Sequence, residues 1–165
     1  MRKLLYCLLA ALILNSCGIY SFSGTSIQPD EQTVCIPFAG YTALRVNPSL
    51  SNDLTEALRT RFRKMTRLEQ VDMDGDLELV LTITGYDVAA TAVTADEVAA
   101  RNRLTVGVKL EYINRKHPSS SLNQSFSAYS DYDSTNSLDA VESTLCAEII
   151  DKLVEDIFNA TVAQW

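Results

Sequence analysis

The stretch LTVGVKLEY, residues 104–112, decides the fold class, because apolar residues occupy every second position along it. Successive side chains of a β-strand point to opposite faces, so this pattern predicts a strand with one buried and one polar face. Residues 77–88 show the same alternation, with a bulge expected at Gly85, and residues 122–130 show it again. Three such strands joined by turns predict an antiparallel meander.

Two amphipathic helices flank the meander in the sequence. Asn47 and Pro48 are typical of a helix start, as N-cap and first helical residue, and predict a helix over about 48–65. Residues 135–137, Thr-Asn-Ser, would cap a second helix that extends beyond Phe158. Its apolar stripe consists of Leu138, Val141, Leu145, Ile149, Leu153 and Ile157.

Two short segments, residues 33–38 and 68–71, complete the predicted strands. Pro37 lacks a backbone N–H, which places it at a sheet edge or at a strand end. The predicted order is β-α-β-β-β-β-α. Both helices then cover the apolar face of a mostly antiparallel sheet of four to five strands, and the fold class is α+β, a two-layer sandwich.

The N-terminus has the pattern of a secretory signal. Two basic residues precede an apolar run that ends at Leu14 and is shorter than the ~20 residues of a membrane span. The sequence from Leu14 to Cys17 resembles a bacterial lipobox. It predicts cleavage before Cys17, with a thioether-linked diacylglycerol and an N-acyl chain on that residue. An ordinary signal peptide is the alternative, but it would place Leu14 where a small residue is preferred.

The resulting organisation has three parts. Residues 1–16 are the predicted signal peptide, residues 17–32 a lipidated tether, and residues 33–165 a single α/β domain. The tether is rich in Ser, Gly and turn formers, and its apolar residues indicate that part of it packs on the domain.

Composition disfavours two classes of function. The chain holds 14 basic and 21 acidic residues, and the predicted cleavage would remove only basic ones. Such an acidic protein is a poor candidate for nucleic-acid binding. His117 is the only histidine, and no catalytic, metal-binding or nucleotide-binding motif accompanies it. We therefore expect no enzyme activity, no metal and no cofactor beyond the acyl chains on Cys17.

Two smaller features leave alternatives open. The acidic turn at residues 72–76 resembles part of a calcium loop, but the bidentate Glu of such a loop is missing, so a plain turn is favoured. Cys35 and Cys146 could form a disulfide in a secreted protein, although two buried free thiols are the preferred interpretation.

Basic residues gather in two places. One cluster closes the first predicted helix, where it complements the helix dipole: Arg59, Arg61, Arg63, Lys64 and Arg67. The other follows the strand at 102–113 and consists of Arg101, Arg103 and Lys109. Guanidinium groups on a sheet face can make bidentate contacts to phosphate, so these three are the candidate anion site. An ordinary solvent-facing strand is the alternative.

Six segments resemble one branch of the LptE family of lipopolysaccharide-assembly lipoproteins. They occur in the family's order at residues 17–27, 47–50, 83–88, 102–106, 124–127 and 154–160. The resemblance implies two helices on a four-stranded sheet and a place on the periplasmic side of the outer membrane. It also implies that the protein plugs the LptD β-barrel and binds lipopolysaccharide through basic residues of the sheet. Arg101, Arg103 and Lys109 are assigned to that role from charge and placement alone.

A second function of a different class fits the same sequence format. The chain could be a periplasmic accessory lipoprotein of an ABC-type lipid transporter, whose partners would lie in the inner membrane. Gly18 follows Cys17, whereas an Asp at that place retains some lipoproteins at the inner membrane. This difference favours the outer membrane.

Overall fold

The computed structural model describes residues 26–91 and 100–163. The predicted signal peptide, Cys17 and most of the tether lie outside these residues, as do residues 92–99. The described elements, in chain order, are β1 (Thr33–Cys35), β2 (Gly40–Tyr41), α2 (Leu50–Met65), β3 (Glu69–Val71), β4 (Leu77–Ala90), β5 (Arg101–Asn114), a 3-10 turn at Pro118–Ser120, β6 (Leu122–Asp133) and α3 (Leu138–Val162).

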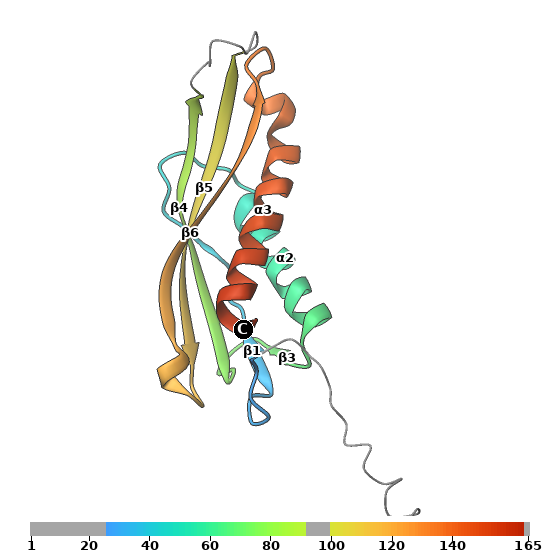
Figure 1. The fold of residues 1–165 in the computed structure, drawn as a ribbon, viewed down its shortest axis with the longest axis vertical. Helices are drawn as coiled ribbons and strands as arrows, with labels where there is room; N and C mark the ends of the chain where they lie inside the picture. Colours follow the sequence, from blue (N-terminus) through green and yellow to red (C-terminus); the bar gives the residue numbers. More distant parts are fainter. Residues whose placement is uncertain (1–25, 92–99, 164–165) are drawn as a thin grey trace, which may run out of the picture.

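One twisted sheet contains all the strands, in the order β3-β1-β4-β5-β6, with β2 also beside β4 (Figure 1). β4, β5 and β6 form the predicted antiparallel meander. β1 pairs in parallel with both β3 and β4, and β2 pairs in parallel with β4. The sheet has six strands rather than four or five. The segment that was expected to form one strand pairs with β4 as far as Cys35, leaves it around Pro37 and pairs with it again from Gly40, so it forms two strands, β1 and β2.

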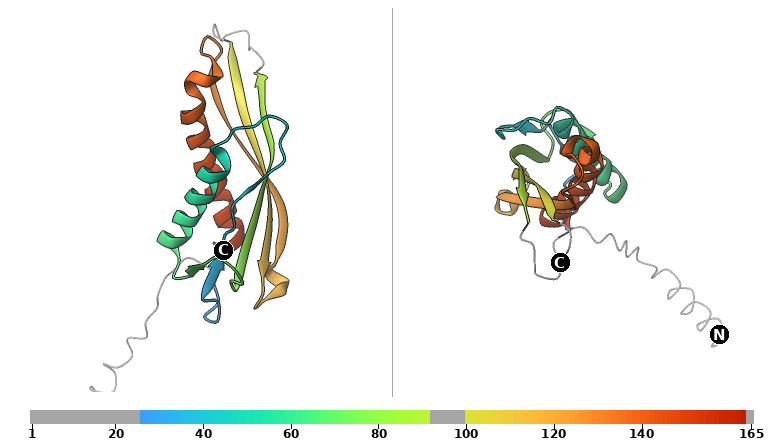
Figure 2. Two further views of the ribbon diagram at one scale, coloured as in Figure 1. Left: turned by 180° about the vertical axis from the view of Figure 1, so that it is seen from behind. Right: turned by 90° about the horizontal axis from the view of Figure 1, so that it is seen from above.

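Both helices lie on one face of this sheet, so the molecule is the predicted two-layer α+β sandwich (Figure 2). α3 packs along β5 and β6, and α2 packs beside α3 and near β3. The apolar face of β5 is fully buried against the helices: Leu104, Val106, Val108 and Leu110 are 0% exposed. The alternation at 104–112 therefore predicted the core face of the central strand correctly.

Local signals in the sequence position the first helix and the bulge. The side-chain Oδ1 of Asn47 accepts hydrogen bonds from the backbone N–H groups of Ser49 (3.1 Å) and Leu50 (3.2 Å). The Asn47 side chain thus supports the first turn of α2, but the N-cap is Ser49 and the helix begins at Leu50, so the predicted cap and first residue each lie two positions too early. The register of β4 against β5 shifts between Ile83 and Gly85, which confirms the predicted bulge.

The acidic turn after β3 joins β1 to β4. Oδ2 of Asp76 accepts hydrogen bonds from the backbone N–H groups of Gln32 (2.9 Å) and Thr33 (3.0 Å) and from the Thr33 hydroxyl (3.0 Å). A Cβ on Gly75 would lie 2.6 Å from the backbone N of Cys35 and 2.8 Å from a backbone oxygen of β4, so only glycine allows this close approach. These contacts make the turn a structural junction, as the plain-turn interpretation required.

The two cysteines of the described domain are buried and free, which confirms the preferred interpretation. The thiol of Cys35 donates to the backbone oxygen of Asp72 at 3.3 Å. Cys146 lies on α3, with the Nδ2 of Asn47 at 3.7 Å and the hydroxyl of Tyr86 at 3.9 Å. Burial raises the pKa of both thiols, so each is held in its neutral form.

Candidate functional site

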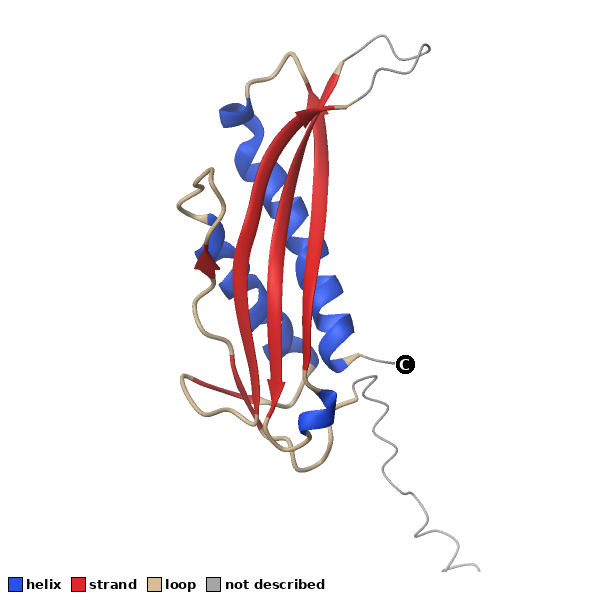
Figure 3. Ribbon diagram, turned by 90° about the vertical axis from the view of Figure 1, so that its left-hand side faces the viewer, coloured by secondary structure: helices blue, strands red, loops and turns tan. Residues whose placement is uncertain are grey.

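The face of the sheet that points away from both helices is the candidate site, and we call it the open face (Figure 3). It is formed by the side chains of β4, β5 and β6 that alternate with the buried ones. The register places these pairs across β5 and β6: Arg101–Asp133, Arg103–Asp131, Thr105–Tyr129, Gly107–Ser127, Lys109–Ser125 and Glu111–Asn123. All three predicted site residues therefore project from the same face of one strand.

Arg103 is held rigidly on this face by two neighbours on β6. Its Nε and Nη2 donate to the two carboxylate oxygens of Asp131 at 2.7 and 2.9 Å. Its guanidinium carbon also lies 3.7 Å from the centre of the Tyr129 ring. The hydrogen bonds from Arg103 lower the pKa of the Asp131 carboxyl, so the pair is ionised at neutral pH. The remaining N–H donors of the planar fork are still available to an acceptor.

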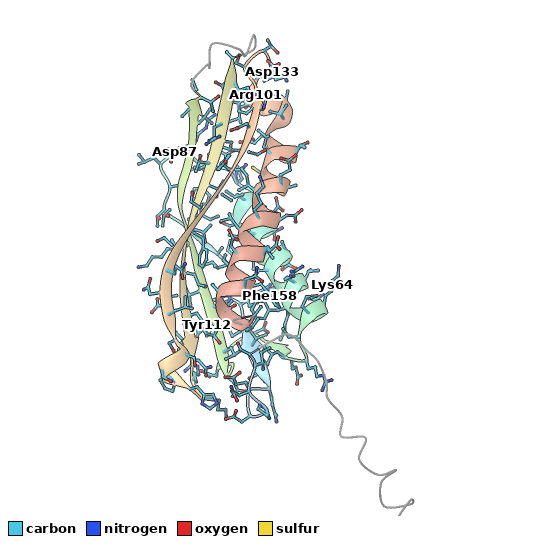
Figure 4. All side chains as sticks on the ribbon, viewed as in Figure 1. Lys64, Asp87, Arg101, Tyr112, Asp133 and Phe158 are labelled. Atoms are coloured by element: carbon cyan, nitrogen blue, oxygen red, sulfur yellow. The ribbon has the colours of Figure 1, made fainter. Side chains whose placement is uncertain are left out.

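Arg101 lies two residues before Arg103 on the same face, at the start of β5 beside the β6–α3 turn (Figure 4). Asp133 opposes it across the strands, but the Asp133 carboxylate accepts hydrogen bonds from the backbone N–H (2.8 Å) and hydroxyl (2.7 Å) of Thr135. Within residues 26–91 and 100–163, no ion pair involves Arg101. Arg101 and Arg103, with Asp131 and Asp133 opposite them, thus form a charged end of the open face that holds two cations and two anions.

Lys109 is separate from this pair. It projects between Thr82 of β4 and Ser125 of β6 and forms no ion pair with any described residue. Six strand positions separate it from Arg103, a distance of ~20 Å at the usual rise of a strand. The structure therefore brings Arg101 and Arg103 together and leaves Lys109 as a second, single cation.

Tyr129 and Asp131 belong to the site but were not predicted from the sequence. Both fall on the polar side of the alternation in β6, so the pattern could place them on the open face. The alternation does not give the register of β6 against β5. Only that register shows that Asp131 meets Arg103 and that Tyr129 supports its guanidinium.

The basic cluster of α2 contributes to structure as well as to surface charge. Arg59 donates two hydrogen bonds to the backbone oxygen of Ile36, at 3.0 and 2.7 Å, and pairs with Glu56 at 2.9 Å. The guanidinium of Arg61 lies 5.2 Å from the centre of the Phe158 ring. The interpretation as a solvated complement to the helix dipole is therefore incomplete for these two arginines.

A buried polar cluster ties β4 to α3 behind the open face. The hydroxyl of Tyr86, which is 2% exposed, donates to the carboxylate of Glu142. Burial, together with this hydrogen bond, raises the pKa of Tyr86. Because the phenol remains neutral and has a partner, the cluster is a satisfied core contact rather than a reactive centre.

The one histidine has an ordinary surface position. Nε2 of His117 lies 3.1 Å from Oδ1 of Asp30, and both side chains are exposed. In the part of the chain that the structure describes, no three His, Cys, Asp or Glu residues are grouped as a metal site would require. None of the described helices is both long enough and apolar enough to cross a bilayer.

Comparison with known proteins identifies the family. The sequence profile of LptE, described as lipopolysaccharide-assembly, matches residues 31–161. The chain belongs to the LptE family. The family profile covers both helices and every strand, including the open face with Arg101, Arg103 and Lys109. No curated protein matches the chain by sequence.

Solved structures share the fold of this chain. A minor lipoprotein from Acinetobacter baumannii superposes with a TM-score of 0.50 and 16% identity, covering 78% of this chain and 91% of that one. A neuraminyllactose-binding hemagglutinin homologue from Helicobacter pylori superposes with a TM-score of 0.54 and 11% identity, covering 85% and 88%. At these identities the likeness concerns the fold alone.

Membership of the LptE family places the chain among the lipoproteins of lipopolysaccharide assembly and outer-membrane biogenesis. This is a binding and assembly role rather than a catalytic one. The predicted membership of this family is thus confirmed. Five of the six segments lie within residues 31–161, and the segment at 17–27 lies outside the match.

Proposed function

We propose that this LptE-family chain is an outer-membrane lipoprotein, held at the periplasmic face by acyl chains on Cys17. In this proposal it plugs the lumen of an LptD-like β-barrel and binds lipopolysaccharide on the open face. The observation that carries the proposal is the open face itself, a long polar surface with a fixed arginine and two further cations.

The shape and chemistry of the open face suit a plug in a wet barrel. β4 and β5 have 14 residues each, so the face is ~45 Å long at the usual rise of a strand. Small hydroxyl and amide side chains cover its middle: Thr82, Thr105, Asn123, Ser125 and Ser127. Such groups hydrogen-bond readily to water or to a polar barrel wall, and they do not require a dry contact.

The cations of the open face suit the phosphate groups of lipopolysaccharide. Arg103 is oriented in advance by Asp131 and Tyr129, so little rotamer freedom is lost when its remaining donors bind an oxyanion. Lys109 forms no ion pair with a described carboxylate, so an anionic ligand would not have to displace one there. Arg101 lies opposite Asp133, whose carboxylate already accepts two hydrogen bonds from Thr135.

Co-purification tests the proposed partner. The tagged full-length protein, extracted from membranes in mild detergent, should recover a large outer-membrane β-barrel in a stable complex. Recovery of inner-membrane transporter subunits instead would favour an accessory lipoprotein of an ABC-type lipid transporter. Absence of any barrel from the purified material would overturn the plug role.

Arg101→Ala should weaken binding of lipopolysaccharide roughly 10-fold, because a hydrogen bond to a charged group contributes ~1.5 kcal/mol. Arg101→Ala combined with Lys109→Ala should weaken binding roughly 100-fold, since the two sites are far enough apart for their effects to add. The dissociation constant would be measured with purified protein on immobilised lipopolysaccharide at fixed salt.

Arg45→Ala is the matched control, because Arg45 is a cation on the loop between β2 and α2, outside the three strands that form the open face. Its dissociation constant should equal that of the unchanged protein. If the double substitution on the open face behaves like this control, lipopolysaccharide does not bind at these residues.

A further inference from the structure

The edges of the described sheet differ in how they are protected. β3 is an edge strand of only three residues. At the edge of β6, Nζ of Lys152 donates to the backbone oxygen of Tyr129 at 2.8 Å, and a lysine placed there opposes the approach of another strand. β4 is covered by β1 and β2 as far as Ile83, and this outer side has no neighbouring strand among the described residues beyond that point.

We call residues 84–90 of β4 the free edge. β5 pairs with one side of these residues. On the other side, the last hydrogen bond within residues 26–91 and 100–163 runs from the backbone N–H of Thr42 to the backbone oxygen of Ile83, at 2.8 Å. Every second residue of a strand directs its N–H and C=O away from a given neighbour, so the free edge presents a row of unpaired donors and acceptors.

The free edge lacks the residues that usually keep other strands away. Its sequence is Thr-Gly-Tyr-Asp-Val-Ala-Ala, with no proline and no lysine. The one charged residue is Asp87, which is exposed and forms no ion pair with a described residue. Figure 4 shows Asp87 in the half of β4 that lies toward Arg101 and Asp133. At seven residues, the free edge is long enough to pair with a whole strand.

Exposed apolar side chains lie on the same side of the sheet. The loop between β2 and α2, residues 42–49, runs beside the β4 edge (Figures 1 and 3). In this loop Leu44 is 104% exposed and Val46 is 69% exposed. Phe38, in the segment that leads into β2, is 64% exposed. Large apolar residues that gather on one side of a soluble domain are typical of a protein contact.

The loop is held in place by one tyrosine of β2. The hydroxyl of Tyr41 donates to the backbone oxygen of Arg45 at 2.7 Å and accepts from the backbone N–H of Asn47 at 3.1 Å. Leu44 and Val46 are therefore presented on a fixed backbone, and a partner would not have to order the loop when it binds.

Charge indicates the kind of partner that fits. The loop contributes one cation, Arg45, and the free edge one anion, Asp87, so together they carry no net charge. This surface has no charge that would select an anionic lipid or a strongly basic protein. A second copy would bring together two chains that each carry a formal charge of −7.

We propose that the free edge of β4 binds an extended, uncharged segment of a partner protein by strand addition. In this mode the backbone hydrogen bonds supply affinity, and apolar side chains of the added strand contact Leu44 and Val46. The inference concerns neither the lipid anchor nor lipopolysaccharide binding, and its test contains no barrel. It therefore stands or falls separately from the proposed function.

Amide hydrogen exchange on the full-length protein in mild detergent tests the proposal. The probe is a nine-residue peptide of alternating threonine and valine with blocked ends. At saturating peptide, the amides of residues 84–90 that face away from β5 should exchange at least roughly fivefold more slowly, since that is the factor that one net backbone hydrogen bond contributes. Exchange in β6, residues 122–133, should not change. Unchanged exchange at 84–90, or equal protection of β6, would overturn the proposal.

A second peptide separates strand pairing from apolar contact. It has the same sequence with a methyl group on every backbone nitrogen, so it keeps the apolar side chains and loses the backbone donors. It should give no protection at residues 84–90. Protection equal to that from the first peptide would show that apolar contact alone is responsible, and strand addition would be wrong.

Leu44→Asp should raise the dissociation constant of the first peptide roughly 10-fold, because the added strand loses an apolar contact. Met73→Asp is the matched control. Met73 is 79% exposed and lies between β3 and β4, so this variant makes the same change of charge and polarity outside the loop. Its dissociation constant should equal that of the unchanged protein. If Met73→Asp weakens binding as much as Leu44→Asp does, the loop is not part of the site.

Two measurements without peptide test the other possible occupants of the free edge. The protein should remain monomeric in sedimentation, and exchange at residues 84–90 should not depend on its concentration. A dimer that protects these residues would assign the edge to a second copy and overturn the proposal. Vesicles of phosphatidylcholine with phosphatidylglycerol should leave exchange at 84–90 unchanged. Protection by the vesicles would assign the edge to a membrane instead.

Discussion

The Cys17→Ser protein is expected to lose its acyl chains and its cleavage, and therefore its permanent hold on the membrane. Serine lacks the thiol that carries the thioether-linked diacylglycerol. One acyl chain of myristoyl size binds a bilayer only reversibly, and a second or third chain makes attachment effectively permanent. Labelled palmitate should enter the unchanged protein and not the Cys17→Ser protein. Mass spectrometry should find the precursor still carrying residues 1–16.

Cys7→Ser is the matched control, because Cys7 lies in the apolar run of the predicted signal peptide. Its product should be labelled, cut before Cys17 and membrane-bound, like the unchanged protein. Label on the Cys17→Ser protein, or a mature N-terminus at another residue, would mean that the anchor has been assigned to the wrong cysteine.

Phe62→Ala should lower the free energy of unfolding by ~4 kcal/mol, a large part of the 5–15 kcal/mol that stabilises a typical domain. Phe62 is 0% exposed and meets Phe158 of α3 edge-to-face, with ring centres 5.2 Å apart. Its removal leaves a cavity where α2 packs on α3. Urea unfolding followed by circular dichroism would measure the loss, and the melting temperature should fall by roughly 10 °C.

Met65→Ala, three residues later on the same helix, should cost less than ~1 kcal/mol because Met65 is half exposed. A double-mutant cycle of Phe62→Ala with Phe158→Ala should show a coupling of ~1 kcal/mol from the ring pair. A loss below ~1 kcal/mol for Phe62→Ala would show that α2 contributes little to the core.

Much of the fold could be predicted from periodicity and local signals. Two patterns identified the buried faces: the alternation in residues 104–112 and the apolar stripe of α3. Side chains share a face every second residue in a strand and every three to four residues in a helix, so the spacing of apolar residues shows which face is buried. Asn47 indicated the region of the helix start through its side-chain acceptor, and Gly85 indicated the bulge through its lack of a side chain. The two-residue β2 has too few residues to show any repeat, so it could not be predicted.

The candidate site was predicted only in part, for a related reason. Charge and alternation placed Arg101, Arg103 and Lys109 on one polar face, and the structure agrees. The sequence could not predict which of these three cations forms an ion pair. Arg103 is fixed by an acid 28 positions away in the sequence. Among the described residues, Arg101 faces Asp133 without a direct ion pair, and Lys109 forms no ion pair.

The sequence by itself determined the class of this protein: a chain with three alternating strands, two amphipathic helices and ordered segments that resemble the LptE family. These are properties of single residues and of short repeats. Cleavage and acylation at Cys17 stay a prediction from the lipobox-like segment. The tertiary structure alone decided the register that pairs Arg103 with Asp131 and the parallel pairing of β1 with β3 and β4. Each of these depends on which distant segments meet, and that is decided by the packing of the whole core rather than by any one stretch.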